Sequence, residues 1–351
     1  MKKIYLFGIS RWKESRLKPF FPNEKLIFLS KWDSNKMENA KKIIVWGRKE
    51  YDGLDEYAKS KNIPLYRIED GFIRSVSLGV DFSQPYSIII DRIGIYFDST
   101  TSSELEEILN SYDFNQDLLN RARRVKQYLV DNRLSKYNIY KDIDIKLDKK
   151  KNQKTILVIG QVEGDASLVY GANNMTNIEL LKEVYSRNPN EYIIYKPHPD
   201  VLSGNRLGYI EDSIALKYCS SIEKEVSIDS ILDIVDEVHT MTSLVGFEAL
   251  LRDKKVICYG LPFYAGWGLT TDIQTSVRRK RVLNLDELIA GAYILYPHYI
   301  DPISLKKCQI ERVLEILTIE KENYHKSLLY RVKIKAKNFI YKKYYALLRH
   351  I

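Results

Sequence analysis

The stretch TILVIGQVEGDAS, residues 155–167, joins an apolar run to a polar, glycine-bearing loop. Its first five residues are apolar apart from one threonine, which is typical of a parallel strand covered by helices on both faces. The loop that follows contains two glycines, which ease the turn, and the carboxylates of Glu163 and Asp165. A strand that runs into such a loop indicates an α/β protein, in which ligands bind beyond the carboxyl ends of the strands.

The same alternation of short apolar runs and helical stretches extends outward from this point in both directions. Strands are predicted at residues 3–7, 26–29, 42–46, 65–68 and 87–90, and again at 155–159, 192–195, 237–239 and 255–259. Helices are predicted at residues 103–110, 116–131, 177–186, 228–234 and 244–251. Two such halves predict a pair of Rossmann-like domains that face each other across a cleft.

A polar stretch separates the two halves. Residues 149–154, KKKNQK, contain no apolar side chain and are predicted to be a linker. We therefore expect an N-terminal domain over residues 1–150 and a C-terminal domain over residues 151–322.

The basic residues concentrate in a C-terminal tail, residues 323–351. The chain has a formal net charge of +9, and the tail holds eight Lys/Arg and no Asp or Glu. Without those eight charges the net charge of the rest is +1. Apolar residues recur in the tail at helical spacing, so it is predicted to be a basic amphipathic helix on an anionic membrane surface. The alternative is a helix packed on the body of the protein, with solvated lysines.

Composition limits the cellular compartment and the classes of binding partner that are expected. The three cysteines, Cys219, Cys258 and Cys308, have no metal-ligand spacing and fit a reducing compartment. The N-terminus lacks the apolar core of a signal peptide, and no apolar run is long enough to span a membrane. The protein is therefore expected in the cytoplasm, peripherally on the inner membrane. Nucleic acid is not expected as a partner, because no nucleic-acid motif accompanies the charge.

Four polar clusters each follow a predicted strand, where this fold class places its ligands. They are EDGFIRS at residues 69–75, GQVEGDAS at 160–167, YKPHPD at 195–200 and HTMTSLVGFEAL at 239–250. Carboxyl ends of parallel strands meet at one edge of a sheet, so the clusters are predicted to form one site.

The second and third clusters carry the candidate catalytic groups. Asp165, or Glu163 beside it, could act at an anomeric carbon as nucleophile, general base or stabiliser of an oxocarbenium-like state. Alternatively, the loop carboxylate caps a helix. Prolines flank His198, which could donate a hydrogen bond or a proton to a phosphate leaving group, with Lys196 as a point charge. The alternative is a surface histidine in a stiff turn.

The fourth cluster is predicted to begin a helix. Thr242 or Ser243 stands at the expected N-cap, where backbone N–H groups and hydroxyls can bind phosphate, although an ordinary cap fits equally well. Glu248 could reach a ribose hydroxyl or be solvated. Gln161 belongs to the second cluster and is assigned with these residues to donor binding.

The first cluster offers groups for a sugar carboxylate or an acceptor. Arg74 could grip a carboxylate with two hydrogen bonds, with Glu69 and Asp70 nearby. A structural ion pair between Asp70 and Arg74 is the alternative. The segment YGLPFYAGWGLT, residues 259–270, could stack on a base or sugar, or form a packed hinge. No metal-binding or cofactor motif is found, so neither a metal nor a cofactor is expected.

Taken in order, EDGFIRSVSLG, GQVEGDAS, YKPHPD, VHTMTSLVGFEALLR and CYGLPFYAGWGLT resemble the bacterial capsule-synthesis Kdo transferases. The resemblance runs from about Tyr66 to Thr270. It implies a GT-B-like fold, CMP-β-Kdo as donor, a glycan or glycolipid acceptor and transfer with retention. It also admits capsule-assembly proteins as partners. Many of these enzymes carry two transferase modules, and this chain has the length of one.

The resemblance also implies residue roles. Asp165 resembles the catalytic carboxylate, and Lys196 and His198 resemble the pair that meets the donor phosphate and the leaving CMP. Thr242 and Ser243 would complete phosphate binding, whereas the acceptor side would hold the first cluster. Two other readings remain open: a CMP-sialic acid transferase, and a non-catalytic scaffold of a capsule assembly complex.

Overall fold

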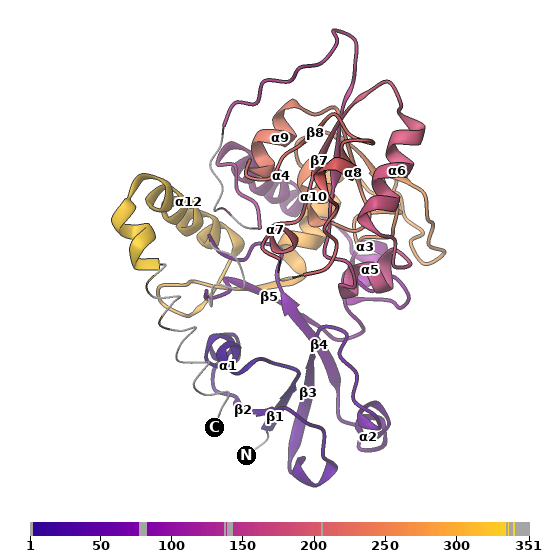
Figure 1. The fold of residues 1–351 in the computed structure, drawn as a ribbon. Coiled ribbons are helices and arrows are strands. Elements are labelled where there is room, and N and C mark those ends of the chain that lie inside the picture. Colours follow the sequence, from indigo (N-terminus) through magenta and orange to yellow (C-terminus); the bar gives the residue numbers. More distant parts are fainter. Residues whose placement is uncertain are drawn as a thin grey trace.

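The computed structural model describes residues 3–76, 83–136, 138, 143–204, 206–334, 336 and 340. Two β-sheets with helices around them build the α/β fold (Figure 1). Within these residues no helix is both long and apolar enough to cross a membrane.

The six-stranded sheet is parallel throughout. Its order is β11-β10-β9-β6-β7-β8. Read from the other edge, this is the order 3-2-1-4-5-6 of a dinucleotide-binding sheet, whose direction of winding reverses between β6 and β9. Its strands are β6 (Thr155–Ile159), β7 (Tyr192–Lys196), β8 (Ser221–Ile222), β9 (Glu237–Thr240), β10 (Lys255–Cys258) and β11 (Thr271–Asp272).

The seven-stranded sheet is mixed. In the order β13-β12-β5-β4-β3-β1-β2, the four strands from β4 to β2 are parallel, and β5, β12 and β13 join antiparallel. Its winding reverses between β1 and β3. The strands are β1 (Lys3–Phe7), β2 (Lys25–Leu29), β3 (Ala40–Trp46), β4 (Leu65–Asp70), β5 (Ser87–Asp91), β12 (Pro297–Ile300) and β13 (Lys307–Cys308).

The helices follow the strands, and several begin at the residues that the sequence predicts. Ser103 caps α3 by accepting a hydrogen bond from the Glu106 backbone N–H, and Thr176 forms a capping box with Glu179. The α-helices are α1 (Arg11–Leu17), α2 (Leu54–Ser60), α3 (Glu104–Ser111), α4 (Gln116–Asp131), α5 (Ala166–Gly171), α6 (Asn177–Arg187), α7 (Pro199–Leu202), α8 (Asp212–Ala215), α9 (Ile228–Ile234), α10 (Leu244–Leu250), α11 (Leu285–Ile289) and α12 (Ile310–Lys326). Helices of other types are η1 (Lys18–Phe20), η2 (Ser34–Lys36) and η4 (Ala290–Leu295).

The chain passes between the sheets more than once. After the six-stranded sheet is complete, β12 pairs with β5 and adds β13 to the edge of the first sheet. The two sheets therefore do not divide the chain at a single point. Residues 143–154 contain no helix or strand, in keeping with their polar composition.

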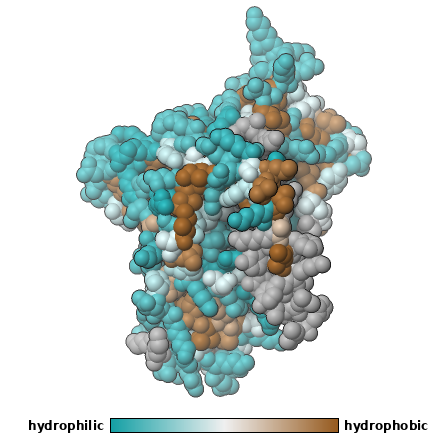
Figure 2. Space-filling view, turned by 90° about the vertical axis from the view of Figure 1, so that its left-hand side faces the viewer, coloured by the Kyte–Doolittle hydropathy of each residue, from teal (hydrophilic) through white to brown (hydrophobic). Residues whose placement is uncertain are grey.

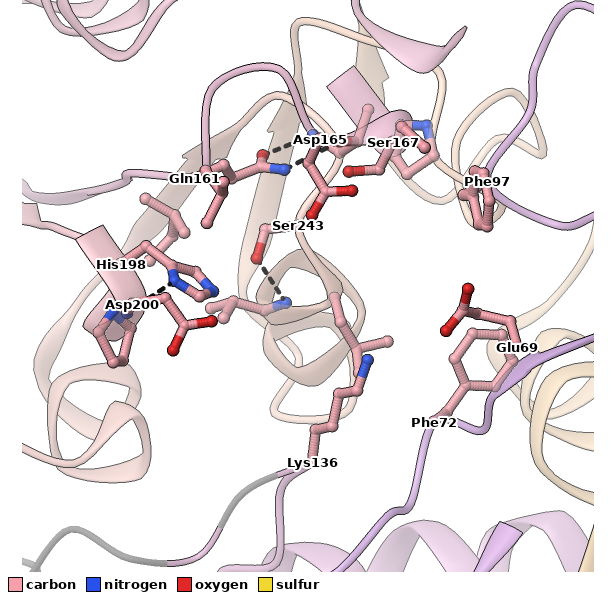
Figure 3. A pocket seen from close by; sticks show the side chains of 18 of the residues that line it. Glu69, Phe72, Phe97, Lys136, Gln161, Asp165, Ser167, His198, Asp200 and Ser243 are labelled. Atoms are coloured by element: carbon pink, nitrogen blue, oxygen red, sulfur yellow. Dashed lines mark hydrogen bonds between the residues drawn. The ribbon is translucent and has the colours of Figure 1, made fainter. Parts of the chain in front are cut away.

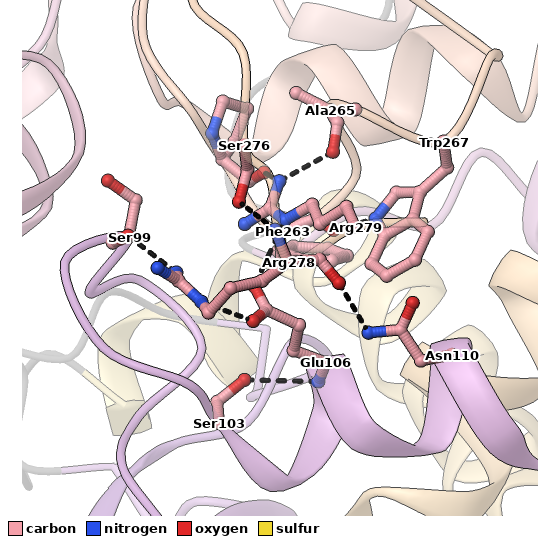
Figure 4. Close-up of polar contacts among 12 residues, drawn as sticks. Ser99, Ser103, Glu106, Asn110, Phe263, Ala265, Trp267, Ser276, Arg278 and Arg279 are labelled. Carbon is pink, nitrogen blue, oxygen red and sulfur yellow. Dashed lines mark hydrogen bonds and ion pairs between the residues drawn. The ribbon is translucent and has the colours of Figure 1, made fainter. Parts of the chain in front are cut away.

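A buried ion cluster and an aromatic cluster join the two parts. The Glu106 carboxylate on α3 accepts hydrogen bonds from Arg278, at 2.7 Å, and from Arg279, at 3.2 Å (Figure 4). Arg279 also donates to the carbonyl oxygens of Pro262 and Ala265. The rings of Phe72, Tyr96, Phe247, Phe263, Tyr293 and Tyr296 pack beside this cluster.

The predicted tail is described only in part. Residues 328–334 are helical, whereas 335, 337–339 and 341–351 lie outside the described residues. The side chains of Leu328, Leu329 and Val332 are 68%, 84% and 56% exposed. Figure 2 shows the side of the molecule that carries α12, where hydrophobic patches stand in a mainly hydrophilic surface.

Candidate active site

A cavity of about 880 Å³ lies where the winding of both sheets reverses. Gly8 and Gly47, just after β1 and β3, line one side, and Gly160 and Thr242, just after β6 and β9, line another. Parallel sheets place ligands at these points, because the loops on the two sides of a reversal diverge and leave a crevice.

Most of the sequence-predicted residues meet in this cavity. Its wall contains Glu69, Gln161, Asp165, Lys196, His198, Thr242, Ser243 and Glu248. Asp165 and His198 therefore share one space although they follow different strands. Figure 3 shows His198 and Glu69 on opposite sides of that space. Glu163, Asp70 and Arg74 are not part of the wall.

Gln161 ties the loops after β6 and β9 together. Its side-chain N–H donates to Thr242 Oγ1 at 2.9 Å, and its oxygen accepts from the Thr242 backbone N–H at 2.8 Å. The Gln161 backbone N–H donates to Oδ1 of Asn177, which is only 1% exposed. Gln161 thus fixes the geometry of the crevice, and it leaves the Thr242 hydroxyl hydrogen free to point at a ligand.

The two carboxylates of the GQVEGDAS loop have different surroundings. Asp165 is the N-cap residue of α5, yet its side chain accepts no hydrogen bond within the described part of the chain. Its Oδ2 lies 3.9 Å from a guanidinium nitrogen of Arg206. Glu163 instead accepts a 2.8 Å hydrogen bond from the Asn177 backbone N–H, outside the cavity wall. Asp165 is the carboxylate that faces open space.

His198 is held in one orientation by its own turn. Its Nδ1 accepts a 3.1 Å hydrogen bond from the Asp200 backbone N–H at the start of α7. Burial lowers the pKa of His198, so the neutral ring is favoured. A neutral imidazole whose Nδ1 accepts must carry its hydrogen on Nε2. His198 can therefore donate Nε2–H to an oxygen in the cavity.

Lys196 is largely buried at the end of β7. Its Nζ donates to the Val226 carbonyl oxygen at 2.7 Å. Burial lowers the pKa of Lys196 to about 8. The side chain therefore stays mostly charged at neutral pH, and Lys196 is one of the residues that line the cavity.

The start of α10 brings a hydroxyl and a buried carboxyl. Ser243 caps the helix by accepting a 3.2 Å hydrogen bond from the Val245 N–H. Glu248, one turn later, is 4% exposed and accepts from the Lys136 backbone N–H at 3.1 Å. Burial, followed by the charge of Asp229, raises the pKa of Glu248 to about 7. Glu248 is thus a protonatable group in the wall of the cavity.

On the other side of the cavity, the EDGFIRS residues form an ion cluster. Asp70 Oδ2 lies 3.1 Å from Arg74 Nε and 3.2 Å from Lys13 Nζ. Burial alone would raise the pKa of Asp70, but Arg74 and Lys13 outweigh it and lower that pKa to about 2. Arg74 is fully buried and also donates to the Ser75 and Ser83 hydroxyls. This is the structural ion pair that the sequence left as an alternative.

Glu69 is the member of that cluster that reaches the cavity. Its Oε1 accepts a 3.0 Å hydrogen bond from the Asp70 backbone N–H. Burial, and then the charge of Asp70, raise the pKa of Glu69 to about 7. A carboxyl group with such a pKa can exchange a proton near neutral pH.

The aromatic segment 259–270 forms packing rather than an open platform. Phe263 is 6% exposed and stacks on Phe72 with ring centroids 4.6 Å apart. Trp267 is 1% exposed, and its indole N–H donates to the Phe263 carbonyl oxygen at 2.8 Å. These contacts show that the segment is packed, and its Pro262 and Phe263 also line the cavity.

Several basic wall residues were not predicted from the sequence. The cavity wall contains five Asp/Glu and seven Lys/Arg, the latter being Lys13, Arg48, Lys49, Lys136, Lys196, Arg206 and Lys321. Such a wall favours an anionic ligand. Only Lys196 stands in a recognisable motif. Arg48 and Lys49 stand together after Gly47, directly behind the predicted strand 42–46, and this position could have indicated them. The other four are single basic residues among 55 in the chain, so no local pattern distinguishes them.

Comparison with known proteins identifies similar chains in bacterial surface polysaccharide systems. Over 332 residues the chain is 43% identical to the capsule polysaccharide modification protein LipA of Neisseria meningitidis serogroup A, a match that covers 93% of this chain and 46% of LipA. It is 38% identical over 335 residues to the lipopolysaccharide-processing protein LpsZ of Rhizobium meliloti, with 93% and 76% covered. The chain thus spans about half the length of LipA.

Two solved structures have the same fold. The β-Kdo 2,4 transferase of Thermosulfurimonas dismutans KpsC has a TM-score of 0.79 and 32% identity, with 90% of this chain and 98% of that chain covered. The β-Kdo 2,7 transferase of the same KpsC has a TM-score of 0.74 and 40% identity, with 91% and 100% covered. Residues 41–299 match the family model described as capsule polysaccharide biosynthesis protein. The chain belongs to the capsule polysaccharide biosynthesis family.

Proposed function

We propose that this chain is a retaining glycosyltransferase that moves Kdo from CMP-β-Kdo to a glycan or glycolipid acceptor in capsule or surface polysaccharide synthesis. The single observation that carries the proposal is the shared cavity of Asp165 and His198, where a carboxylate that accepts no hydrogen bond from the described residues and a ring N–H occupy one space. The similarity to the two KpsC transferases supports the sugar and the reaction type.

The donor is proposed to lie against the six-stranded sheet. CMP-Kdo carries a phosphodiester and a carboxylate, and the basic balance of the cavity wall suits both. Lys196, His198 and the hydroxyls of Thr242 and Ser243 would meet the phosphate, and Glu248 would donate to a ribose hydroxyl. Gln161 would act by holding Thr242 in place.

Two displacements would give retention. In the first, the Asp165 carboxylate attacks the anomeric carbon while the bond to the phosphate oxygen breaks, and CMP leaves with a hydrogen bond or proton from His198 Nε2. In the second, an acceptor hydroxyl attacks that carbon, its proton passes to a base, and the Asp165–carbon bond breaks. Glu69, on the opposite wall, is our candidate for the base. Each step inverts the anomeric centre, so the product is β-linked.

We propose that two domains provide these two sides. The seven-stranded sheet would carry the acceptor side, and the six-stranded sheet would carry the donor side. Asp70 and Arg74 would shape the acceptor side through their ion pair, and Glu163 would shape the loop that presents Asp165.

The direct test supplies CMP-Kdo and a Kdo-primed acceptor and measures CMP release together with the anomeric configuration of the product by NMR. We expect release of CMP and a β-linkage. CMP-sialic acid, offered at equal concentration, is expected to be turned over at least about 10-fold more slowly, because the family resemblance favours Kdo. A preference for CMP-sialic acid would refute the choice of sugar. CMP binding without turnover of either donor would favour a scaffold.

We further propose that residues 323–351 hold the protein on an anionic membrane surface at the cytoplasmic side. The exposed Leu328, Leu329 and Val332 would enter the lipid interface, and the eight basic residues would contact its anionic headgroups. A variant that ends at residue 322 should sediment less with vesicles containing anionic lipid, yet keep its rate on a soluble acceptor. Equal sedimentation of both forms would contradict the proposal.

A further inference from the structure

Arg67 carries a buried guanidinium group. Its side chain projects from β4 and is 8% exposed, and its Nη1 donates to the Lys49 carbonyl oxygen at 2.6 Å. No carboxylate among the described residues forms an ion pair with it. Burial, and then the charge of Arg48, lower the pKa of its guanidinium group. The charges of Asp55, Glu50 and Asp98 oppose this shift, but none of the three carboxylates forms a direct ion pair with Arg67, so its guanidinium group can accept an anion as a further partner.

Arg67 lines a second cavity, of about 480 Å³, beside α2. The exposed Lys59 and Thr101 stand in the same wall, as do two carboxylates. One of these, Asp91, is fully engaged, since it accepts from the Ile93, Gly94 and Glu104 N–H groups and from the Tyr296 hydroxyl. The other, Asp55, is exposed on α2. The cavity therefore offers cations and a hydroxyl to an anionic ligand.

The two cavities share one lining residue. Arg48, in the turn after β3, lines both cavities. Its Nε lies 2.5 Å from Asp98 Oδ2, and its guanidinium carbon stands 5.3 Å from the ring centre of Tyr170 on α5. Arg48 is thus fixed at the junction, with contacts to the parts that carry both sheets. A ligand chain that leaves the acceptor side of the first cavity would pass Arg48 and meet Arg67.

We propose that the second cavity is an acceptor subsite that binds an anionic group, a carboxylate or a phosphate, one unit beyond the sugar that receives Kdo. This inference rests on the proposed function, since it assumes that an acceptor occupies the seven-stranded-sheet side of the first cavity. Arg67 and Arg48 would bind the anionic group with charge-assisted hydrogen bonds, and Lys59 would add a charge at the rim.

The test compares acceptors that differ in reach. A β-Kdo monosaccharide glycoside fills the first cavity only, whereas a β-Kdo disaccharide glycoside also presents a carboxylate to the second. Arg67→Gln should raise KM for the disaccharide about 10- to 100-fold, the range for a lost hydrogen bond to a charged group. KM for the monosaccharide and for CMP-Kdo should stay within about 2-fold. Arg67→Lys should recover part of the loss. Equal effects on both acceptors, or none, would overturn the subsite.

Two exposed lysines give a second test of the subsite that does not depend on replacing the buried Arg67. Lys59 lines the second cavity and Lys61, two residues later, does not, although both are exposed. Lys59→Gln should raise KM for the disaccharide about 2- to 5-fold, as expected for one exposed charge, and Lys61→Gln should leave it unchanged. Equal KM values for these two variants would count against the subsite.

Calorimetry without donor separates this inference from the proposed function. Wild-type protein is titrated with the disaccharide and, separately, with an alkyl phosphate, and Arg67→Gln should weaken at least one of the two. Which one it weakens identifies the anion. Arg67-dependent binding without any Kdo transfer would support an anion-binding site at the second cavity and refute the transferase, so that the site could no longer be called an acceptor subsite. Kdo transfer by a protein whose binding of both probes is unchanged by Arg67→Gln would support the transferase and refute the subsite.

Discussion

Asp165 lies in the loop after β6 and lines the cavity, whereas Asp70 is the last residue of β4 and lies behind the cavity wall, and the environments of the two carboxylates are opposite. The side chain of Asp165 is 47% exposed and has one distant cation, Arg206, at 3.9 Å. The side chain of Asp70 is 14% exposed and meets Arg74 and Lys13 at 3.1 and 3.2 Å. Sequence position alone made both residues candidates. A carboxylate is therefore available for chemistry when its lone pairs face a cavity. It stabilises the folded chain instead when buried cations already bind those lone pairs.

The largest expected effect concerns Asp165. Asp165→Asn should lower kcat for Kdo transfer by about 10⁴-fold, roughly 5.5 kcal/mol in the activation barrier, because the amide is a poor nucleophile. The free energy of unfolding should change by less than about 0.5 kcal/mol, as for other partly exposed surface positions. Rates of CMP release and urea denaturation measure the two. Asp212→Asn, on α8 and outside the cavity wall, is the control and should keep full activity.

Asp70 should show the reverse pattern. Asp70→Asn leaves the fully buried Arg74 without its carboxylate and should lower the free energy of unfolding by about 3–5 kcal/mol. Urea denaturation at pH 7 gives this value. At a temperature where the variant stays folded, its turnover should fall far less than that of the Asp165 variant. A stable but inactive Asp70 variant would contradict the structural role assigned to this carboxylate.

A third carboxyl group, Glu248, can be compared with these two through the pH dependence of protein stability. Its pKa is raised from the ordinary 4.5 to about 7, so folding favours the protonated form. The stability associated with that proton is complete below pH 4.5 and is lost as pH rises through 7. Glu248→Gln keeps the hydrogen bond with Lys136 and removes the titration. The variant should match wild type near pH 4.5 and exceed its stability by up to about 3 kcal/mol at pH 8.

Urea denaturation at several pH values measures this difference. Glu287→Gln serves as a matched control, because Glu287 is a carboxyl group of the α11 capping box and does not line the cavity. This variant shows how much stability changes when a carboxyl group away from the cavity is replaced by an amide. A pH-independent difference for Glu248→Gln would show that the buried carboxyl stays charged.

The α/β class and the positions of most strands could be predicted because their signals are local. The apolar run TILVI is enough to predict β6 without knowledge of its neighbours in the fold. The predicted and observed bounds of β1 and α4 agree. The strands β12 and β13, at one end of the first sheet, gave no such signal. They are short, and their place in the first sheet depends on pairing with β5, more than 200 residues away in sequence.

The candidate site divides in the same way. Polar clusters after strands identified Asp165, His198 and Lys196, because strand ends fix where a following loop must lie. The state of the Asp70–Arg74 pair could not be read from the sequence, because it depends on Lys13, from another element, and on burial. Arg206 and Lys136 were missed for a related reason: each is a single basic residue in a loop, and only the folded chain brings them to the cavity.

The late return of the chain to its first sheet has a consequence for biosynthesis. During synthesis, β5 lacks its partner strand β12 until residues 297–300 have been translated. Until then one side of β5 is an open edge, able to pair with a strand of another chain. A nascent chain stalled before this point would therefore be prone to aggregation.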